Sequence, residues 1–266
     1  MFCCRICGNN IDNTFYQGKE TRIGLGDEFV YVKCSKCGCL QIKEYPSNIA
    51  KYYDEYYSLQ QPKTKESRFV TLARNQLLKY KMTRQNFFGK LLDKLNPDSF
   101  YWIEPHMFSF DSSIIDIGCG SGRLVLKLAN SGFHNISGID PFLNGDIVYY
   151  LKNKQIIIKK QSIYELEGHY DFLMLHHVLE HLPDQYRVLE KLASLMHKNS
   201  KLLINIPIID SYTWNYYGMN AFQLADIPRH YYLHSITSFY MLAEKCNLKI
   251  EVYRSKIRLI LSGFVQ

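Results

Sequence analysis

The residues best suited to chemistry lie in a short glycine-rich run, Ser113–Arg123. Two isoleucines near its start predict a buried strand, and Asp116 follows where that strand should end. Three glycines then stand at alternate positions, and without Cβ atoms they let the backbone pass close beneath a ligand. The apolar run Leu124–Asn130 predicts a helix after this loop. A strand, a tight turn and a helix in this order are typical of the first unit of a nucleotide-binding α/β sheet. The three glycines are Gly118, Gly120 and Gly122.

Two acids favour one class of ligand for this loop. The glycine spacing differs from the Gly-x-Gly-x-x-Gly pattern of pyrophosphate binders, and Asp116 would repel a pyrophosphate. Its charge suits the amino group and the sulfonium of S-adenosylmethionine. Ile136–Ile139 predicts a second strand, and Asp140 follows it, about twenty residues beyond the glycines, where a carboxylate accepts hydrogen bonds from ribose hydroxyls. A dinucleotide is the alternative ligand, and the pairing of Asp116 with Asp140 favours the methyl donor.

A third strand, Gln155–Lys159, should bring further polar groups to the same ligand. Gln161 and Ser162 follow it and are placed to meet the adenine. His176 follows the strand Tyr170–Leu175 and should flank the methionine end of the donor. The predicted donor-binding residues are Asp116, Gly118, Cys119, Gly120, Asp140, Pro141, Gln161, Ser162 and His176.

Cysteine usage predicts a metal centre near the N-terminus. Of eight cysteines, six lie before residue 40. Four of them form two matched Cys-x-x-Cys-Gly knuckles, a spacing typical of a closed, tetrahedral structural zinc site. Disulfides are the alternative, which a reducing compartment disfavours. Cys3 and Cys39 each lie beside a predicted ligand and could replace it. The predicted zinc ligands are Cys4, Cys7, Cys34 and Cys37.

Length and composition limit the remaining possibilities. The chain has 266 residues, 47% of them hydrophobic, which allows one domain of ordinary size and a small appendage. Its formal net charge of +7 is spread along the chain, which permits an acidic partner without requiring one. We find no signal-peptide-like opening and no run of eighteen apolar residues, so we expect a cytoplasmic protein without a membrane partner.

The order of elements predicts an α/β fold. Strands are expected at Lys201–Ile206, Leu248–Ser255 and Ile257–Leu261, with a helix over Asp184–His197. With the strands above, they predict a doubly wound, mostly parallel, seven-stranded sheet whose last two strands form a hairpin. Apolar residues at helical spacing in Glu66–Leu95 predict helices that cover the sheet and border the cofactor site. The expected units are a zinc-binding ribbon (1–45), a Tyr-rich linker with helical cover (46–110) and a methyl-donor-binding domain (111–266).

Two groups of histidines are candidates for catalysis. His177-x-x-Glu180-His181 spells an inverted zinc-protease motif, but it starts where a strand ends, a loop position rather than the middle of a long helix. In a methyltransferase His181 could face the acceptor as a general base, and a structural role for it is the alternative. His230 follows Arg229, which suits a phosphate, in the aromatic segment Tyr212–Tyr232, whose rings suit stacking on a sugar. The predicted catalytic residues are His181, His230 and His177.

These motifs together resemble the class I S-adenosylmethionine-dependent methyltransferases. The chain is most similar to a bacterial subgroup that has an N-terminal zinc-binding domain and includes sugar C-methyltransferases. The resemblance implies S-adenosylmethionine as cofactor, a structural zinc ion and a sugar acceptor. A Glu-His pair of those enzymes is replaced here by Arg229-His230, so transfer to a sugar hydroxyl is at least as well supported as transfer to carbon. The matching segments are Asp116–Gly122, Asp140, His177–Leu182, the two cysteine knuckles and Tyr56-Tyr57-Ser58.

The sequence therefore predicts methyl transfer to a small molecule, a sugar or nucleotide-sugar in glycan or natural-product biosynthesis. An RNA-directed methyltransferase or RNA-binding protein that grips nucleic acid with its zinc module is the alternative. Against it, the sequence has no basic stripe and no Asn-Pro-Pro-Tyr-type motif after the strand Tyr170–Leu175. A non-catalytic binder is a third reading, which the intact donor loop disfavours.

Overall fold

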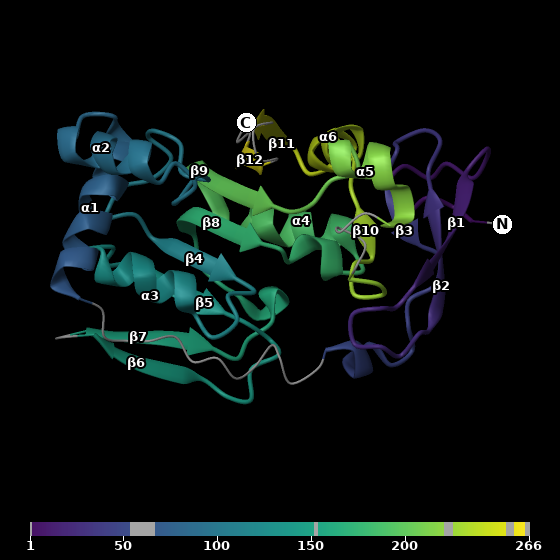
Figure 1. The fold of residues 1–266 in the computed structure, drawn as a ribbon, viewed down its shortest axis with the longest axis horizontal. Coiled ribbons are helices and arrows are strands. Elements are labelled where there is room, and N and C mark those ends of the chain that lie inside the picture. The colour runs from purple at the N-terminus through teal and green to yellow at the C-terminus, as the bar shows by residue number, and fades with distance from the viewer. Residues whose placement is uncertain (1, 54–66, 152–153, 221–225, 254–257, 264–266) are drawn as a thin grey trace.

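The computed structural model describes residues 2–53, 67–151, 154–220, 226–253 and 258–263. Its strands form a four-stranded sheet near the N-terminus and an eight-stranded main sheet (Figure 1). The tyrosine motif at residues 56–58 lies outside the described residues. Among the helices of the described ranges, none combines the length and apolar character needed to cross a bilayer.

The main sheet has eight strands where seven were predicted. Its order is β11-β12-β9-β8-β4-β5-β7-β6, with five parallel strands in the centre and antiparallel pairs at both edges. The additional strand is β6, which pairs antiparallel with β7. The prediction relied on strands alternating with helices, and β6 breaks that alternation. The strands are β4 (Ile114–Ile117), β5 (Ile136–Ile139), β6 (Ile147–Leu151), β7 (Lys154–Lys159), β8 (Tyr170–His176), β9 (Met196–Asn205), β11 (Leu248–Tyr253) and β12 (Arg258–Gly263).

The N-terminal sheet is completed by a strand from the far end of the chain. Strands β1 (Thr14–Lys19), β2 (Glu28–Lys33) and β3 (Leu40–Ile42) are antiparallel neighbours, and β10 (Tyr232–Leu233) pairs with β3. Side chains from both parts of the chain share one hydrophobic core cluster. The segment 1–45 is therefore packed into the rest of the protein.

The helices lie around the main sheet and at one end of it. α1 and α2 lie at the end of the molecule opposite the N-terminal sheet (Figure 1). α4 is shorter than expected because β9 already begins at Met196, and the Asp184 side chain caps its start by accepting a hydrogen bond from the Arg187 N–H at 3.1 Å. The helices are α1 (Arg68–Thr83), α2 (Phe87–Leu95), α3 (Arg123–Asn130), α4 (Gln185–Ser194), α5 (Tyr212–Tyr217) and α6 (Ile236–Lys245).

The contact between α1 and α2 depends on a glycine. A Cβ atom on Gly89 would lie 2.1 Å from the carbonyl oxygen of Gln76 and 2.5 Å from Cβ of Tyr80. On its other side α1 buries Leu78 and Met82 in a core cluster of the main sheet. The close approach of the two helices thus leaves no room for a side chain at residue 89.

We expect Gly89→Ala to destabilise the protein by about 1–3 kcal/mol, because the added methyl group overpacks this contact. Inside a helix the same change ordinarily stabilises by about 0.5–1 kcal/mol, so the sign of the effect is informative. Urea unfolding of the variant measures it. Gly145→Ala is the matched control, since nothing lies within 4 Å of its added Cβ atom. A more stable Gly89→Ala protein would contradict the packing described here.

Candidate functional site

A cleft lies where four neighbouring parallel strands, β8, β4, β5 and β7, end. Its walls come from the glycine loop after β4, the turn after β5, residues 162–164 after β7 and residues 177–182 after β8, with Tyr53 from the N-terminal part. Strand β4 lies between β5 and β8 in the sheet. The chain segments that follow these strands therefore separate at this edge and leave a crevice between them. Ligands of open α/β sheets bind at this kind of crevice.

The glycine loop is shaped by tight packing on two sides and open space at its tip. Gly118 has φ +72°, and a Cβ atom there would lie 2.4 Å from Cγ2 of Val178. Gly122 has φ +80°, and its Cβ would lie 2.5 Å from Cδ1 of Ile158. Gly120, between them, has nothing within 4 Å of the corresponding position. The loop is therefore held from below while its middle residue leaves space for a ligand.

Asp140 is the fixed carboxylate of the cleft. Oδ2 accepts a hydrogen bond from the Gly120 N–H, and Oδ1 accepts one from the Phe142 N–H, each at 2.9 Å. The residue is 4% exposed and lines the cleft, and each oxygen retains a further lone pair for a ribose hydroxyl. These bonds orient Asp140 before any ligand binds.

Asp116 lies behind the loop rather than in the cleft wall. It is 3% exposed, and burial together with the charge of Asp140 raises its pKa to about 8. A cationic group bound nearby would favour its ionised form. The two buried acids thus make this end of the cleft a favourable place for a positively charged ligand.

The other predicted donor residues divide into two groups. Pro141 and Ser162 line the cleft beside Gly118 and Asp140. The Cys119 side chain instead packs against Gly138, where an added Cβ would lie 2.6 Å from its sulfur.

Two further predicted donor residues turn their side chains toward the protein. Gln161 donates its Nε2–H to the Glu165 carbonyl at 2.9 Å. His176 packs edge-on against Trp102, with ring centroids 5.2 Å apart, and its Nδ1 lies 3.3 Å from Nδ2 of Asn205. Neither is among the residues that line the cleft.

Aromatic side chains complete this wall, and two of them, Phe142 and Tyr164, were not singled out from the sequence. Phe142 follows Asp140 by two residues and stacks on Tyr53, with ring centroids 5.3 Å apart and planes at 18°. Tyr164 lies on the wall after β7. The sequence did contain a signal for this wall, since Phe142 follows the predicted ribose-binding acid Asp140 by two residues and a flat ring beside that acid suits a purine.

Three histidines and a carboxylate meet at the end of β8. His177 Nδ1 lies 3.4 Å from Oε1 of Glu180, and His230 Nε2 lies 4.0 Å from the same oxygen. The rings of His181 and His230 are 4.7 Å apart. The segment is a loop followed by the short 3-10 turn Leu179–His181, as expected from its position after a strand. The structure thus brings the three predicted catalytic histidines together, with His177 and His181 in the cleft wall.

The tautomer of His181 follows from its partner. Nδ1 lies 2.9 Å from the Arg229 carbonyl oxygen, which can only accept, so Nδ1 carries the proton and Nε2 has a free lone pair. Burial and the neighbouring His230 lower the pKa of His181 to about 4, while the nearby carboxylate of Glu180 raises the pKa of His177. At neutral pH His181 is therefore an uncharged imidazole.

Asp226 is a second acid that the sequence analysis did not assign to the site. Its Oδ2 lies 3.4 Å from Nε2 of His230, and its Oδ1 pairs with Arg229 and, at 2.5 Å, with Arg22 from the N-terminal part. Arg229 is buried in this pair, so its guanidinium is committed to a carboxylate rather than open to a phosphate. The pair between Arg22 and Asp226 joins residues more than 200 positions apart, so no local sequence pattern predicts it.

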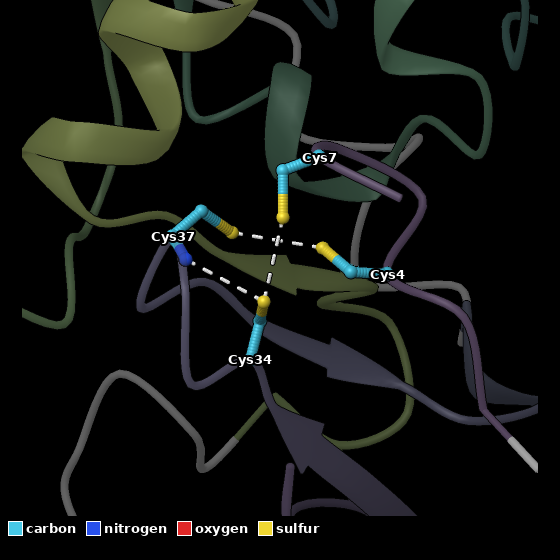
Figure 2. Close-up of side chains that lie close together, drawn as sticks. All are labelled: Cys4, Cys7, Cys34 and Cys37. Atoms are coloured by element: carbon cyan, nitrogen blue, oxygen red, sulfur yellow. Dashed lines mark hydrogen bonds between the residues drawn. The ribbon is translucent and has the colours of Figure 1, made fainter. Parts of the chain in front are cut away.

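The four predicted zinc ligands form one cluster. Figure 2 shows the sulfurs of Cys4, Cys7, Cys34 and Cys37 pointing toward a common centre. The Cys4–Cys37 and Cys7–Cys34 sulfur distances are 3.6 and 3.5 Å. Four thiolates around one zinc ion stand about 3.8 Å apart, given Zn–S bonds of about 2.3 Å. The donor set and its spacing fit tetrahedral zinc.

The two alternative cysteines lie outside this cluster. Cys3 is exposed, and its sulfur lies 3.2 Å from the Gly8 carbonyl oxygen. Cys39 is buried, with its sulfur 3.9 Å from Nδ1 of His234. Gln41 Nε2 lies 2.9 Å from the Cys4 sulfur, a hydrogen bond that helps hold a thiolate. The cluster therefore contains the four cysteines predicted as ligands, and neither Cys3 nor Cys39 replaces one of them.

A family model described as a methyltransferase domain matches residues 74–252, about two thirds of the chain. The chain belongs to this family. Membership confirms the enzyme class predicted from the glycine loop. It does not reach the cysteine cluster, so the narrower similarity to zinc-containing sugar methyltransferases stays a prediction for this methyltransferase.

Known relatives match parts of the methyltransferase. A ubiquinone biosynthesis O-methyltransferase from Erwinia tasmaniensis is 27% identical over 134 residues, 47% of this chain and 55% of that protein. EEF1A lysine methyltransferase 2 from Homo sapiens is 46% identical over 39 residues, 15% of this chain and 16% of that protein. A methyltransferase structure from Methanosarcina mazei aligns at a TM-score of 0.43 and 18% identity, covering 60% of this chain and 96% of that one. The chain thus spans about half the length of the O-methyltransferase it matches.

Asp140→Ala should weaken binding of S-adenosylhomocysteine by about 1–3 kcal/mol, because the ribose loses a pair of hydrogen bonds to a charged acceptor. Calorimetric titration measures the loss. Asp111→Ala removes the same charge from an exposed position of the same part of the chain and should leave the affinity unchanged. Tight binding of a nicotinamide dinucleotide, with no response to S-adenosylhomocysteine, would contradict the assignment of the cleft.

Cys34→Ser should release the metal of the cysteine cluster and destabilise the N-terminal part, because a structural zinc site contributes directly to folding. Metal analysis of protein purified without chelator should find about one zinc per chain at this site in the wild type. Cys3→Ser is the control, since that sulfur lies outside the cluster. Full zinc content in Cys34→Ser, or none in the wild type, would contradict the prediction.

Proposed function

We propose that this methyltransferase transfers the methyl group of S-adenosylmethionine to a hydroxyl oxygen of a small molecule, a sugar or nucleotide-sugar. One observation carries the proposal. The fixed carboxylate Asp140 and the glycine loop line the same cleft as His177 and His181. A donor held by the first pair would present its methyl group toward the second pair, where an acceptor can bind.

The chemistry asked of the protein is modest. The sulfonium charge already activates the donor, so the protein aligns the acceptor oxygen in line with the carbon–sulfur bond. As the new oxygen–carbon bond forms, the carbon–sulfur bond breaks and its electron pair stays on sulfur, leaving neutral S-adenosylhomocysteine. The hydroxyl proton passes to Nε2 of His181, whose lone pair is free because Nδ1 holds the proton. The carboxylate of Glu180 favours the charged ring, and His230, whose ring lies 4.7 Å from that of His181, helps to orient it.

Several features support an oxygen acceptor of the sugar class. The Erwinia relative is an O-methyltransferase, although that name speaks for its own substrate only. The cleft wall carries exposed aromatic surface at Tyr164, which suits the apolar face of a pyranose. Because Arg229 is paired with Asp226, its guanidinium is not available to a phosphate, so within the proposed class a sugar without a phosphate is favoured over a nucleotide-sugar.

His181→Ala and His230→Ala should each lower turnover by about 10²–10⁴-fold, since each removes a group that handles the acceptor's proton. Affinity for S-adenosylhomocysteine should stay nearly unchanged, because the donor end is built from other residues. His169→Ala, at an exposed position, is the control. Formation of S-adenosylhomocysteine with a panel of sugars and nucleotide-sugars measures turnover. Near-normal rates in both variants would show that these histidines are structural, and methylation of phenols but of no sugar would overturn the acceptor class.

A further inference from the structure

The carboxylate of Glu180 is buried without a hydrogen-bond partner. Its side chain is 0% exposed, and neither Oε1 nor Oε2 makes a hydrogen bond. Its neighbours are imidazole nitrogens, Nδ1 of His177 at 3.4 Å and Nε2 of His230 at 4.0 Å. Burial of a carboxylate is unfavourable unless a cation or several hydrogen bonds compensate for the lost water. The side chain therefore points to a positively charged ligand.

The groups around Glu180 form a suitable set of ligands. One carboxylate oxygen of Glu180 and one ring nitrogen each of His181 and His230 all lie within 4.8 Å of one another. Bonds of about 2.0–2.2 Å to a divalent ion place such atoms about 3–4 Å apart, so a small inward movement closes the set. Two imidazoles and a carboxylate, with no sulfur, suit zinc, manganese, iron or cobalt.

Surrounding contacts prepare these side chains for coordination. The Arg229 carbonyl holds the proton of His181 on Nδ1 and leaves the Nε2 lone pair for an ion. Asp226 lies 3.4 Å from Nε2 of His230 and adds negative charge beside the set. The contact at His181, which orients the ring through the nitrogen that does not face the ion, is characteristic of metal-binding histidines.

We propose that Glu180, His181 and His230 bind one divalent cation at the acceptor side of the cleft, distinct from the metal of the cysteine cluster. Three protein ligands leave open positions, and His181 lines the cleft, so these positions face the space for the acceptor. The role assigned to the ion rests on the proposed function: a hydroxyl bound to it becomes more acidic before methyl transfer. A bound ion occupies the Nε2 lone pair of His181, so with the ion in place the proton of the hydroxyl passes instead to His177, which lies in the same cleft wall beside Glu180.

Manganese titration of the full chain tests the site without any acceptor. Protein with its cysteine-bound zinc retained, checked by metal analysis, is titrated with Mn²⁺ alone and followed by electron paramagnetic resonance. We expect about one bound Mn²⁺ per chain, with affinity about 10–100-fold weaker in Glu180→Gln and in His230→Ala. His197→Ala is the matched control, because that histidine also pairs with a carboxylate, Asp171 at 2.8 Å, but lies outside the cluster.

Cobalt provides a second readout on the wild type. Co²⁺ bound here should absorb without thiolate-to-metal charge transfer, since the ligands are nitrogen and oxygen only. Zinc content and thermal unfolding show whether each variant is folded. If Glu180→Gln does not fold, the affinity of His230→Ala for Mn²⁺ and the cobalt spectrum of the wild type test the cation site. Absence of Mn²⁺ binding at millimolar concentration, equal affinity in the folded variants, or a thiolate signature would overturn the proposal. Cation binding without sugar methylation would refute the proposed acceptor but leave the cation site standing.

Discussion

The short antiparallel pair between β3 and β10 is the constraint on which both halves of the protein depend. It joins Gln41 to Tyr232 across nearly 200 residues of chain. Gln41 comes four residues after Cys37, and Tyr232 comes two residues after His230, so the same strand pair fixes the region of the cysteine cluster and the loop of a predicted catalytic histidine. The hydroxyl of Tyr31, in β2, donates to the His230 carbonyl at 2.9 Å and holds the same loop from below. A metal ion at the cysteines would thus act on the cleft through packing, with no contact to any substrate.

The parts of the site that could be predicted from sequence are those that one strand end and its neighbours determine. The glycine loop and Asp140 each follow a short apolar strand, and parallel strands bring their carboxyl ends to one edge of the sheet. The cluster of four cysteines was predictable because each pair is local in the sequence and a tetrahedral zinc site would require four. Strand β6 was missed for the opposite reason, because only its pairing with β7 makes it part of the sheet.

The orientation of His176 could have been predicted from the sequence, whereas the contact between Glu180 and His230 depends on the three-dimensional fold. Alternation along β8 places His176 on the face of Phe172 and Met174, which pack in the same core cluster as Trp102, so its position away from the cleft was accessible from strand parity. The meeting of Glu180 with His230 could not be predicted, because fifty residues separate them, including α4, β9 and α5. The motif that resembled a protease site contains a buried acid, Glu180, which lies beside His177 of the same motif and beside His230 from a distant part of the chain.

The positions of the buried acids favour the movement of positive charge that the proposed reaction requires. Methyl transfer removes a positive charge from sulfur and creates one where the acceptor's proton goes. Acids that stabilised only the sulfonium would hold back the reaction, since stabilisation counts only when it is stronger in the transition state. Asp140 has both oxygens bonded to backbone N–H groups, which reduces its charge toward the donor, whereas Glu180 keeps both oxygens free beside the imidazoles. Glu180, the carboxylate with fewer hydrogen bonds, thus lies beside the imidazoles that become positively charged. Electrostatic stabilisation of the transition state requires this arrangement.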